Sequence, residues 1–143
     1  MTPELLKLLL AAHVFVTLFM TGLIWFVQVV HYPLFDRVGK PEFARYEGQN
    51  TRRTGWVVGG PMLLELMLAV VLAWSPGGTA AWCGLGLLGI IWLSTAALQI
   101  PMHRRLEQGF DPAAHRQLVR GNWIRTIAWS LRGFLAVEML AYP

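Results

Sequence analysis

An uncharged stretch near the start of the chain constrains the fold most strongly. Residues 8–35 contain no Asp, Glu, Lys or Arg, and about 20 apolar residues are enough for a helix to cross the hydrocarbon core of a bilayer. Only 14% of the 143 residues are charged, whereas soluble domains usually contain about a quarter. The sequence therefore predicts an integral membrane protein whose first span covers about residues 5–31.

A second charge-poor stretch predicts two more spans. Residues 54–103 contain one charged residue, Glu65. The sequence Ser75-Pro-Gly-Gly in this stretch is typical of a turn and divides it in two. We therefore expect spans over about residues 55–74 and 81–103.

A fourth helix is expected to begin at Asp111-Pro112, because an N-cap aspartate followed by proline is a common start of a helix. Its apolar part predicts the fourth span, over about residues 122–142. The preceding residues 112–121 are amphipathic, and so are residues 41–53, which also begin with a proline. Helices two and four are therefore expected to extend past the membrane on the cytoplasmic side.

The predicted fold class is all-α: a four-helix transmembrane bundle with up-and-down topology, forming one domain over residues 1–143. Short matches between the two halves also favour a duplicated two-helix hairpin. Gly22-Leu-Ile-Trp25 matches Gly89-Ile-Ile-Trp92, Pro33 matches Pro101, Pro41 matches Pro112, and Arg53-Thr54 matches Arg125-Thr126. Chance matches between apolar helices are the alternative.

Basic residues gather between the first and second spans and between the third and fourth. They are Arg37, Lys40, Arg45, Arg52, Arg53, Arg104, Arg105, Arg116 and Arg120, and the other side has Lys7. Because basic loops are retained in the cytoplasm, we expect both termini outside a bacterial-type inner membrane. The net charge of +4 then reflects topology and contact with the lipid bilayer, not binding to nucleic acid.

Polar residues within the apolar spans predict a cavity inside the bundle. They are Gln28 and His31 in the first helix, Gln99 and His103 in the third, and Asn122, Arg125, Trp129 and Arg132 in the fourth. Helical spacing places the members of each set on one face, and polar groups are costly where they face lipid. We therefore expect these residues and Glu65 to line an intramembrane cavity that opens to the cytoplasmic side.

Glu65 and Arg132 are expected to lie at the same depth in the membrane. Each lies ten residues beyond the cytoplasmic start of its span, counted from Gly55 and from Asn122. An isolated charge near the middle of a bilayer is costly, so the two side chains are expected to pair. Two interpretations stay open: a structural ion pair, or a functional pair that orients a ligand or carries a proton on Glu65.

His31 and His103 end the first and third spans on the cytoplasmic side. These helices are diagonal neighbours in an up-and-down bundle, so the two imidazoles are candidate ligands of a haem or a transition metal. The alternative is that they cap helix ends or lie among lipid head groups, with no cofactor bound. The sequence leaves the cofactor unknown.

Two segments of the second half resemble a known family. They are Gln99-Ile-Pro-Met-His103-Arg-Arg-Leu106 and Leu118-Val-Arg-Gly-Asn122-Trp-Ile-Arg125-Thr126, and they are similar to segments of the small four-helix membrane proteins of the anthrone-oxygenase-like group. His103 stands where that family often has Asn. The resemblance implies oxygenation or redox chemistry on a flat, lipophilic aromatic such as an anthrone or a quinol.

The resemblance also implies roles for individual residues. His31 or His103 is the implied base, and Arg125 with Asn122 is implied to stabilise the enolate formed from the substrate. Three functions stay open: a redox or oxygenase-type membrane enzyme, a haem- or metal-binding membrane redox protein, and a non-enzymatic interaction or transport module. A homo-oligomer is compatible with all three.

Overall fold

The computed structural model describes residues 1–75 and 78–142, and all regular structure in these ranges is helical. The elements are α1 (Pro3–Phe26), η1 (Val27–His31), η2 (Pro33–Arg37), α2 (Lys40–Ala73), α3 (Gly78–Ser94), η3 (Thr95–Gln99), α4 (Ile100–Leu106) and α5 (Pro112–Ala141). η1 and η3 are π-helical turns that continue α1 and join α3 to α4, so the chain forms four long helices. The predicted all-α fold is confirmed. The turn predicted at Ser75–Gly78 includes residues 76–77, which lie outside the described residues.

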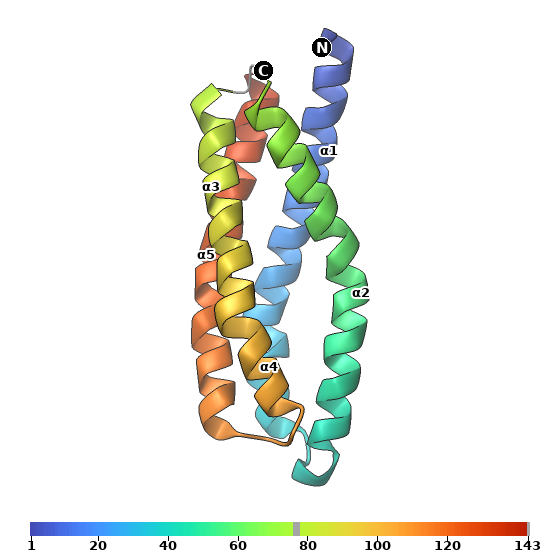
Figure 1. The fold of residues 1–143 in the computed structure, drawn as a ribbon, viewed down its shortest axis with the longest axis vertical. Coiled ribbons are helices and arrows are strands. Elements are labelled where there is room, and N and C mark those ends of the chain that lie inside the picture. The colour runs from blue at the N-terminus through green and yellow to red at the C-terminus, as the bar shows by residue number, and fades with distance from the viewer. Residues whose placement is uncertain (76–77, 143) are drawn as a thin grey trace.

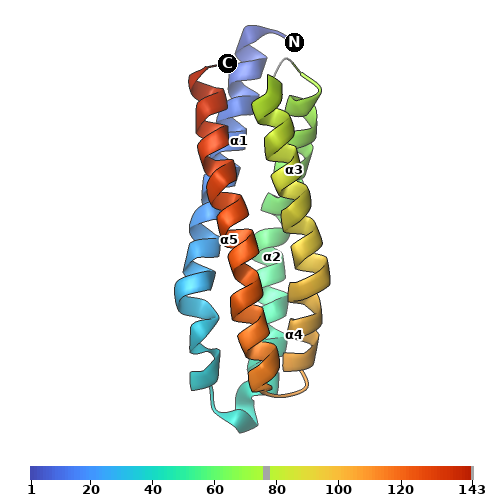
Figure 2. The ribbon, with the colours of Figure 1, turned by 90° about the vertical axis from the view of Figure 1, so that its left-hand side faces the viewer.

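The four long helices lie side by side (Figure 1). Both termini lie at one end of the molecule, and the connections at residues 38–39 and 107–111 lie at the other, which we call the basic end (Figure 2). α1 and α3 each pack against both α2 and α5. Among the described residues the backbones of α1 and α3 make no close approach, and neither do those of α2 and α5. These two pairs are therefore diagonal.

Three helical stretches are long and apolar enough to cross a membrane: Pro3–Arg37, Lys40–Ala73 and Gly78–Leu106. They contain the predicted spans 5–31 and 81–103 and all of the predicted span 55–74 except its last residue. With 30 residues, α5 is long enough to cross a membrane. It is not among the candidate spans found in the described residues, because Arg125, Arg132 and Glu138 interrupt its apolar sequence. The fourth span therefore stays a prediction.

Two π-helical turns, η1 and η3, lie near the basic end of the bundle. η1 ends at His31, two residues before Pro33, and η3 ends at Gln99, two residues before Pro101. Proline has no backbone N–H to donate, which frees a carbonyl one turn earlier, and π-turns are frequent at functional sites. The first residues of the two turns, 27 and 95, are 68 positions apart, and so are the two prolines, 33 and 101. The two halves of the chain therefore share a structural feature in addition to the short sequence matches.

Asp111 fixes the start of α5, as its sequence predicts. Its carboxylate accepts hydrogen bonds from the backbone N–H groups of Ala113 (2.8 Å) and Ala114 (3.2 Å), and Arg105 binds its other oxygen at 2.6 Å. The two backbone hydrogen bonds, and then Arg105, hold the pKa of this carboxyl group below its usual value. The N-cap thus joins the end of α4 to the head of α5 and sets the direction in which α5 enters the bundle.

Candidate functional site

A cavity of about 330 Å³ lies among the helices near the basic end. Its walls come from α1 and η1, from α2, and from η3 and α4, and α5 contributes Arg125. Toward the middle of the bundle the lining is apolar and includes Met20, Ile24 and Met62. Toward the basic end the lining is polar. A cavity with one apolar and one polar end fits a lipophilic molecule that carries a polar group.

A chain of three hydrogen-bonding side chains borders the polar end. Nδ1 of His103 contacts Oε1 of Glu47, a carboxylate that is completely buried. The hydroxyl group of Tyr32 lies 2.9 Å from Nε2 of the same imidazole. Because a carboxylate only accepts hydrogen bonds, Nδ1 carries the proton when His103 is neutral, and Nε2 then accepts the hydroxyl hydrogen of Tyr32.

Asn50 extends this chain to a second histidine. Its Nδ2 donates to Oε2 of Glu47 at 3.1 Å, so its Oδ1 is left to accept hydrogen bonds. Nε2 of His31 donates to this oxygen at 2.8 Å, and Thr54 Oγ1 donates to it at 3.2 Å. The network therefore runs from His31 through Asn50 and Glu47 to His103. Its hydrogen-bond directions determine which ring nitrogen of each histidine carries the hydrogen when the ring is neutral: Nε2 in His31 and Nδ1 in His103.

Arg125 brings a positive charge to the same end of the cavity. Its guanidinium group lies near the Tyr32 hydroxyl group and 5.7 Å from the centre of the Trp129 ring. Its Nε is buried and, among the described residues, has no hydrogen-bond partner. No carboxylate of the described residues forms a salt bridge with Arg125, so its charge is available to an anionic ligand.

Local sequence explains why these side chains meet. Glu47, Asn50 and Thr54 are separated by three and four residues, which places them on one face of α2. Gln99 and His103 are four residues apart and lie on one face where η3 passes into α4. The π-turn η1 ends at His31, and Tyr32, which follows it directly, is buried.

The structure brings four of the predicted site residues together at this cavity. His31, Gln99, His103 and Arg125 all line it. The two histidines have different hydrogen-bond partners, His31 with Asn50 and His103 with Glu47 and Tyr32, and their pairing as ligands of one group stays a prediction.

Five other predicted cavity residues do not line it. Gln28 and Asn122 bind each other, with Asn122 Nδ2 donating to Gln28 Oε1 at 3.0 Å, and both are buried between η1 and α5. Asn122 lies nearly one helical turn before Arg125, but it contacts Gln28 of η1, whereas Arg125 lines the cavity. The remaining three, Glu65, Trp129 and Arg132, form a separate buried cluster.

Glu65 and Arg132 pair in the middle of the bundle, as their predicted depth implied. Nη2 of Arg132 lies 3.0 Å from Oε1 of Glu65, and both side chains are almost completely buried. Oε1 also accepts from Thr17 at 3.0 Å, and Oε2 accepts from Nε1 of Trp129 at 3.0 Å. Nη1 of Arg132 donates to the backbone oxygen of Gly84. The cluster therefore joins α1, α2, α3 and α5.

Sequence reasoning missed Tyr32, Glu47 and Asn50. Glu47 lies in the segment 41–53, which the sequence predicts to be amphipathic and to extend past the membrane, whereas its side chain is completely buried. The sequence does contain a pattern that could have identified Glu47 and Asn50. Phe43, Glu47, Asn50 and Thr54 follow one another at spacings of four, three and four residues, which is typical of the inward face of a helix.

The hydrogen bonds of His103 leave neither of its ring nitrogens free for a haem or a metal ion. Both ring nitrogens of His103 already contact protein groups, so ligation would break its contact with Glu47 or Tyr32. Within residues 1–75 and 78–142, no group of three or more His, Cys, Asp or Glu side chains is arranged to hold a metal. His31 and His103 are therefore better explained as members of a hydrogen-bond network.

No protein-family model matches the chain, and no curated protein and no solved structure matches it either. The resemblance to the anthrone-oxygenase-like group stays a prediction. The arrangement of the side chains around the cavity is therefore the basis for any proposed function.

Proposed function

We propose that the chain crosses the membrane four times in an up-and-down arrangement, with α5 as the fourth span and both termini outside. The outer face of α5 supports this, because Ile127, Leu131 and Phe134 are exposed there while Arg132 is buried. The basic end then faces the cytoplasm of a bacterial-type cell, and the first turns of α2 and α5 extend past the inner membrane.

Labelling of single cysteines tests this topology. In a Cys83→Ala background, we expect a membrane-impermeant maleimide to label Tyr142→Cys in intact spheroplasts, and to label Gln108→Cys only after lysis. The physical reason is that a spanning α5 separates these positions by the thickness of the bilayer. Identical labelling of the two positions before lysis would contradict a spanning α5.

We propose further that the cavity binds a flat, lipophilic molecule with an acidic hydroxyl group or an activated methylene group, and removes a proton from it. The chain of contacts from Tyr32 through His103 to Glu47, beside the charge of Arg125, which forms no salt bridge with a described residue, is the observation that carries this proposal. A carboxylate that orients a histidine is a common way to build a general base.

The proton transfer follows from the hydrogen-bond directions. The substrate gives its proton to the Tyr32 oxygen while Tyr32 gives its hydroxyl proton to Nε2 of His103. The imidazolium formed in this way faces the carboxylate of Glu47, which stabilises its charge. Arg125 stabilises the phenolate or enolate left on the substrate.

For an anthrone-type substrate, this step prepares the carbanion for oxidation by dioxygen, as the family resemblance implies. Overall, one anthrone and one dioxygen give one anthraquinone and one water, so that one oxygen atom enters the ring carbonyl and the other leaves as water. The protein contributes binding, proton removal and charge stabilisation.

The test follows conversion of 1,8-dihydroxyanthrone by detergent-purified protein under air, measured by absorbance of the anthraquinone product. We expect a fall of the order of 10²-fold or more for His103→Ala, which removes the base, and for Arg125→Ala, which removes the charge that stabilises the anion. Arg53→Ala is the matched control, because Arg53 occupies the corresponding Arg-Thr sequence of the first half, is exposed and does not line the cavity. Wild-type rates in the variant that carries both His103→Ala and Arg125→Ala, or no conversion by the wild-type protein, would refute the proposal.

A further inference from the structure

A second hollow lies on the outside of the bundle, between η3 and the head of α5. It has a volume of about 300 Å³ and does not share lining residues with the cavity. It is lined by Leu98, Ala113, Arg116, Gln117, Arg120 and Gly121. We call it the α5 groove. It lies at the basic end, ahead of the part of α5 proposed to cross the membrane.

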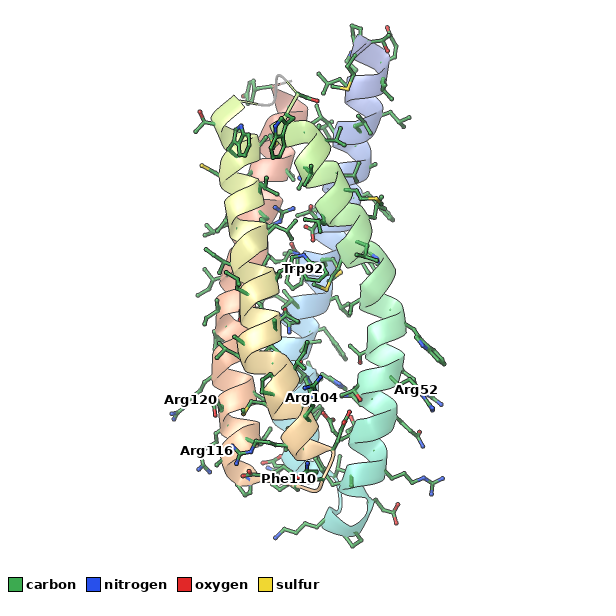
Figure 3. All side chains as sticks on the ribbon, in the orientation of Figure 1. Arg52, Trp92, Arg104, Phe110, Arg116 and Arg120 are labelled. Carbon is green, nitrogen blue, oxygen red and sulfur yellow. The ribbon has the colours of Figure 1, made fainter. Side chains whose placement is uncertain are left out.

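The α5 groove carries two positive charges that form no salt bridge within residues 1–75 and 78–142. Arg116 and Arg120 are four residues apart on α5, and Figure 3 shows both side chains pointing outward on the opposite side of the bundle from Arg52. Neither arginine forms an ion pair with any described residue, and no carboxylate lines the groove. The neighbouring Asp111 is bound to Arg105. The groove is therefore suited to an anion that can contact two guanidinium groups.

The surface next to the groove is apolar. Leu98, Ala113 and Gly121 also line the groove, and farther along α5 the side chains of Trp123, Ile124 and Ile127 are exposed. An exposed tryptophan at this level is typical of the interface between head groups and acyl chains. A molecule in the groove thus meets positive charge at one end and an apolar helix face at the other.

We propose that the α5 groove binds an anionic phospholipid, with the phosphate between Arg116 and Arg120 and an acyl chain along the apolar face of α5. Basic pockets between helices on the cytoplasmic side are known to suit such head groups. A soluble anion would use the arginines alone, and the adjoining apolar surface therefore favours a lipid. This site rests on the proposed membrane placement of α5 and is independent of the proton chemistry in the cavity.

Native mass spectrometry of the detergent-purified full chain with added phosphatidylglycerol tests the proposal. We expect Arg116→Gln with Arg120→Gln to weaken the affinity about thirtyfold, since a basic residue near a lipid surface contributes about fivefold. The control is Arg52→Gln with Arg53→Gln, which removes the same charge outside the groove and is expected to bind within about twofold of wild type.

A further variant leaves the arginines in place. Ala113→Glu puts a negative charge at the groove in the first turn of α5, where an acid is favourable for the helix, and we expect it to weaken lipid binding without loss of the fold, as measured by circular dichroism. The proposal is overturned by equal losses in the groove and control variants, by unchanged binding in Ala113→Glu, by equal affinity for phosphatidylcholine, or by equal affinity for glycerol 3-phosphate. The last result would identify a site for a soluble phosphate.

Discussion

Replacing Glu65 or Arg132 alone is expected to lower the free energy of unfolding by about 3–5 kcal/mol, because each change leaves the other charge buried without a partner. Glu65→Ala leaves Arg132 with the backbone oxygen of Gly84 as its remaining contact. It also removes the acceptor of the Trp129 indole N–H group. Thermal unfolding in detergent, followed by tryptophan fluorescence or circular dichroism, measures the loss.

The matched control replaces the whole pair with apolar residues of similar size. We expect Glu65→Leu with Arg132→Met to be much more stable than either single variant, because the double change removes both buried charges. A double variant as unstable as Glu65→Ala would show that the intact pair contributes net stability, and would contradict our expectation.

Exchanging the two charges is expected to destabilise the fold even if the pair is purely structural. Trp129 and Thr17 both donate hydrogen bonds to the residue at position 65, and the Gly84 oxygen accepts one from the residue at position 132. With Glu65→Arg and Arg132→Glu, donors would face donors and acceptors would face acceptors. The apolar double variant therefore separates a structural role from a proton-carrying role, whereas the exchanged pair does not.

The Glu65–Arg132 pair also shows what sequence alone can predict. Both residues lie ten positions past the expected starts of their spans, and a helix converts sequence separation into depth at a fixed rise. Because unpaired charges are costly in a bilayer, depth was enough to predict the contact, which the structure shows at 3.0 Å.

The candidate site was harder to predict because it depends on the direction in which each side chain points from its helix. Asn122 and Arg125 lie within about 60° of each other around α5 and were therefore assigned to one cavity, but that offset is enough for Asn122 to contact Gln28 while Arg125 lines the cavity. The π-turn η1 also alters the register of the first helix just before Tyr32. A regular helical repeat does not predict such a local change, and Tyr32 was therefore missed.

Glu47 is expected to be a positioning residue on which the proposed chemistry depends strongly. In Glu47→Gln, the side-chain amide can present its oxygen either to His103 or to Asn50, but not to both. If it accepts from Asn50, its nitrogen donates to Nδ1 of His103, and the ring must then carry its proton on Nε2. In that form Nε2 cannot accept the proton of Tyr32. We expect the rate of 1,8-dihydroxyanthrone conversion to fall by the order of 10³-fold.

A second substitution separates this positioning role from simple loss of structure. In Glu47→Gln with Asn50→Asp, the amide introduced at position 47 can donate to the carboxylate introduced at position 50 and accept from Nδ1 of His103, which restores the original hydrogen-bond direction. That carboxylate also keeps acceptors for His31 and Thr54, which in the wild-type protein contact Oδ1 of Asn50. We therefore expect the double variant to recover a large part of the lost rate, while Asn50→Asp alone, which places two carboxylates together, does not exceed wild type. If the double variant were no faster than Glu47→Gln at equal thermal stability, His103 would not depend on the direction of this hydrogen bond, and the proposed route of the proton through Tyr32 and His103 would be wrong.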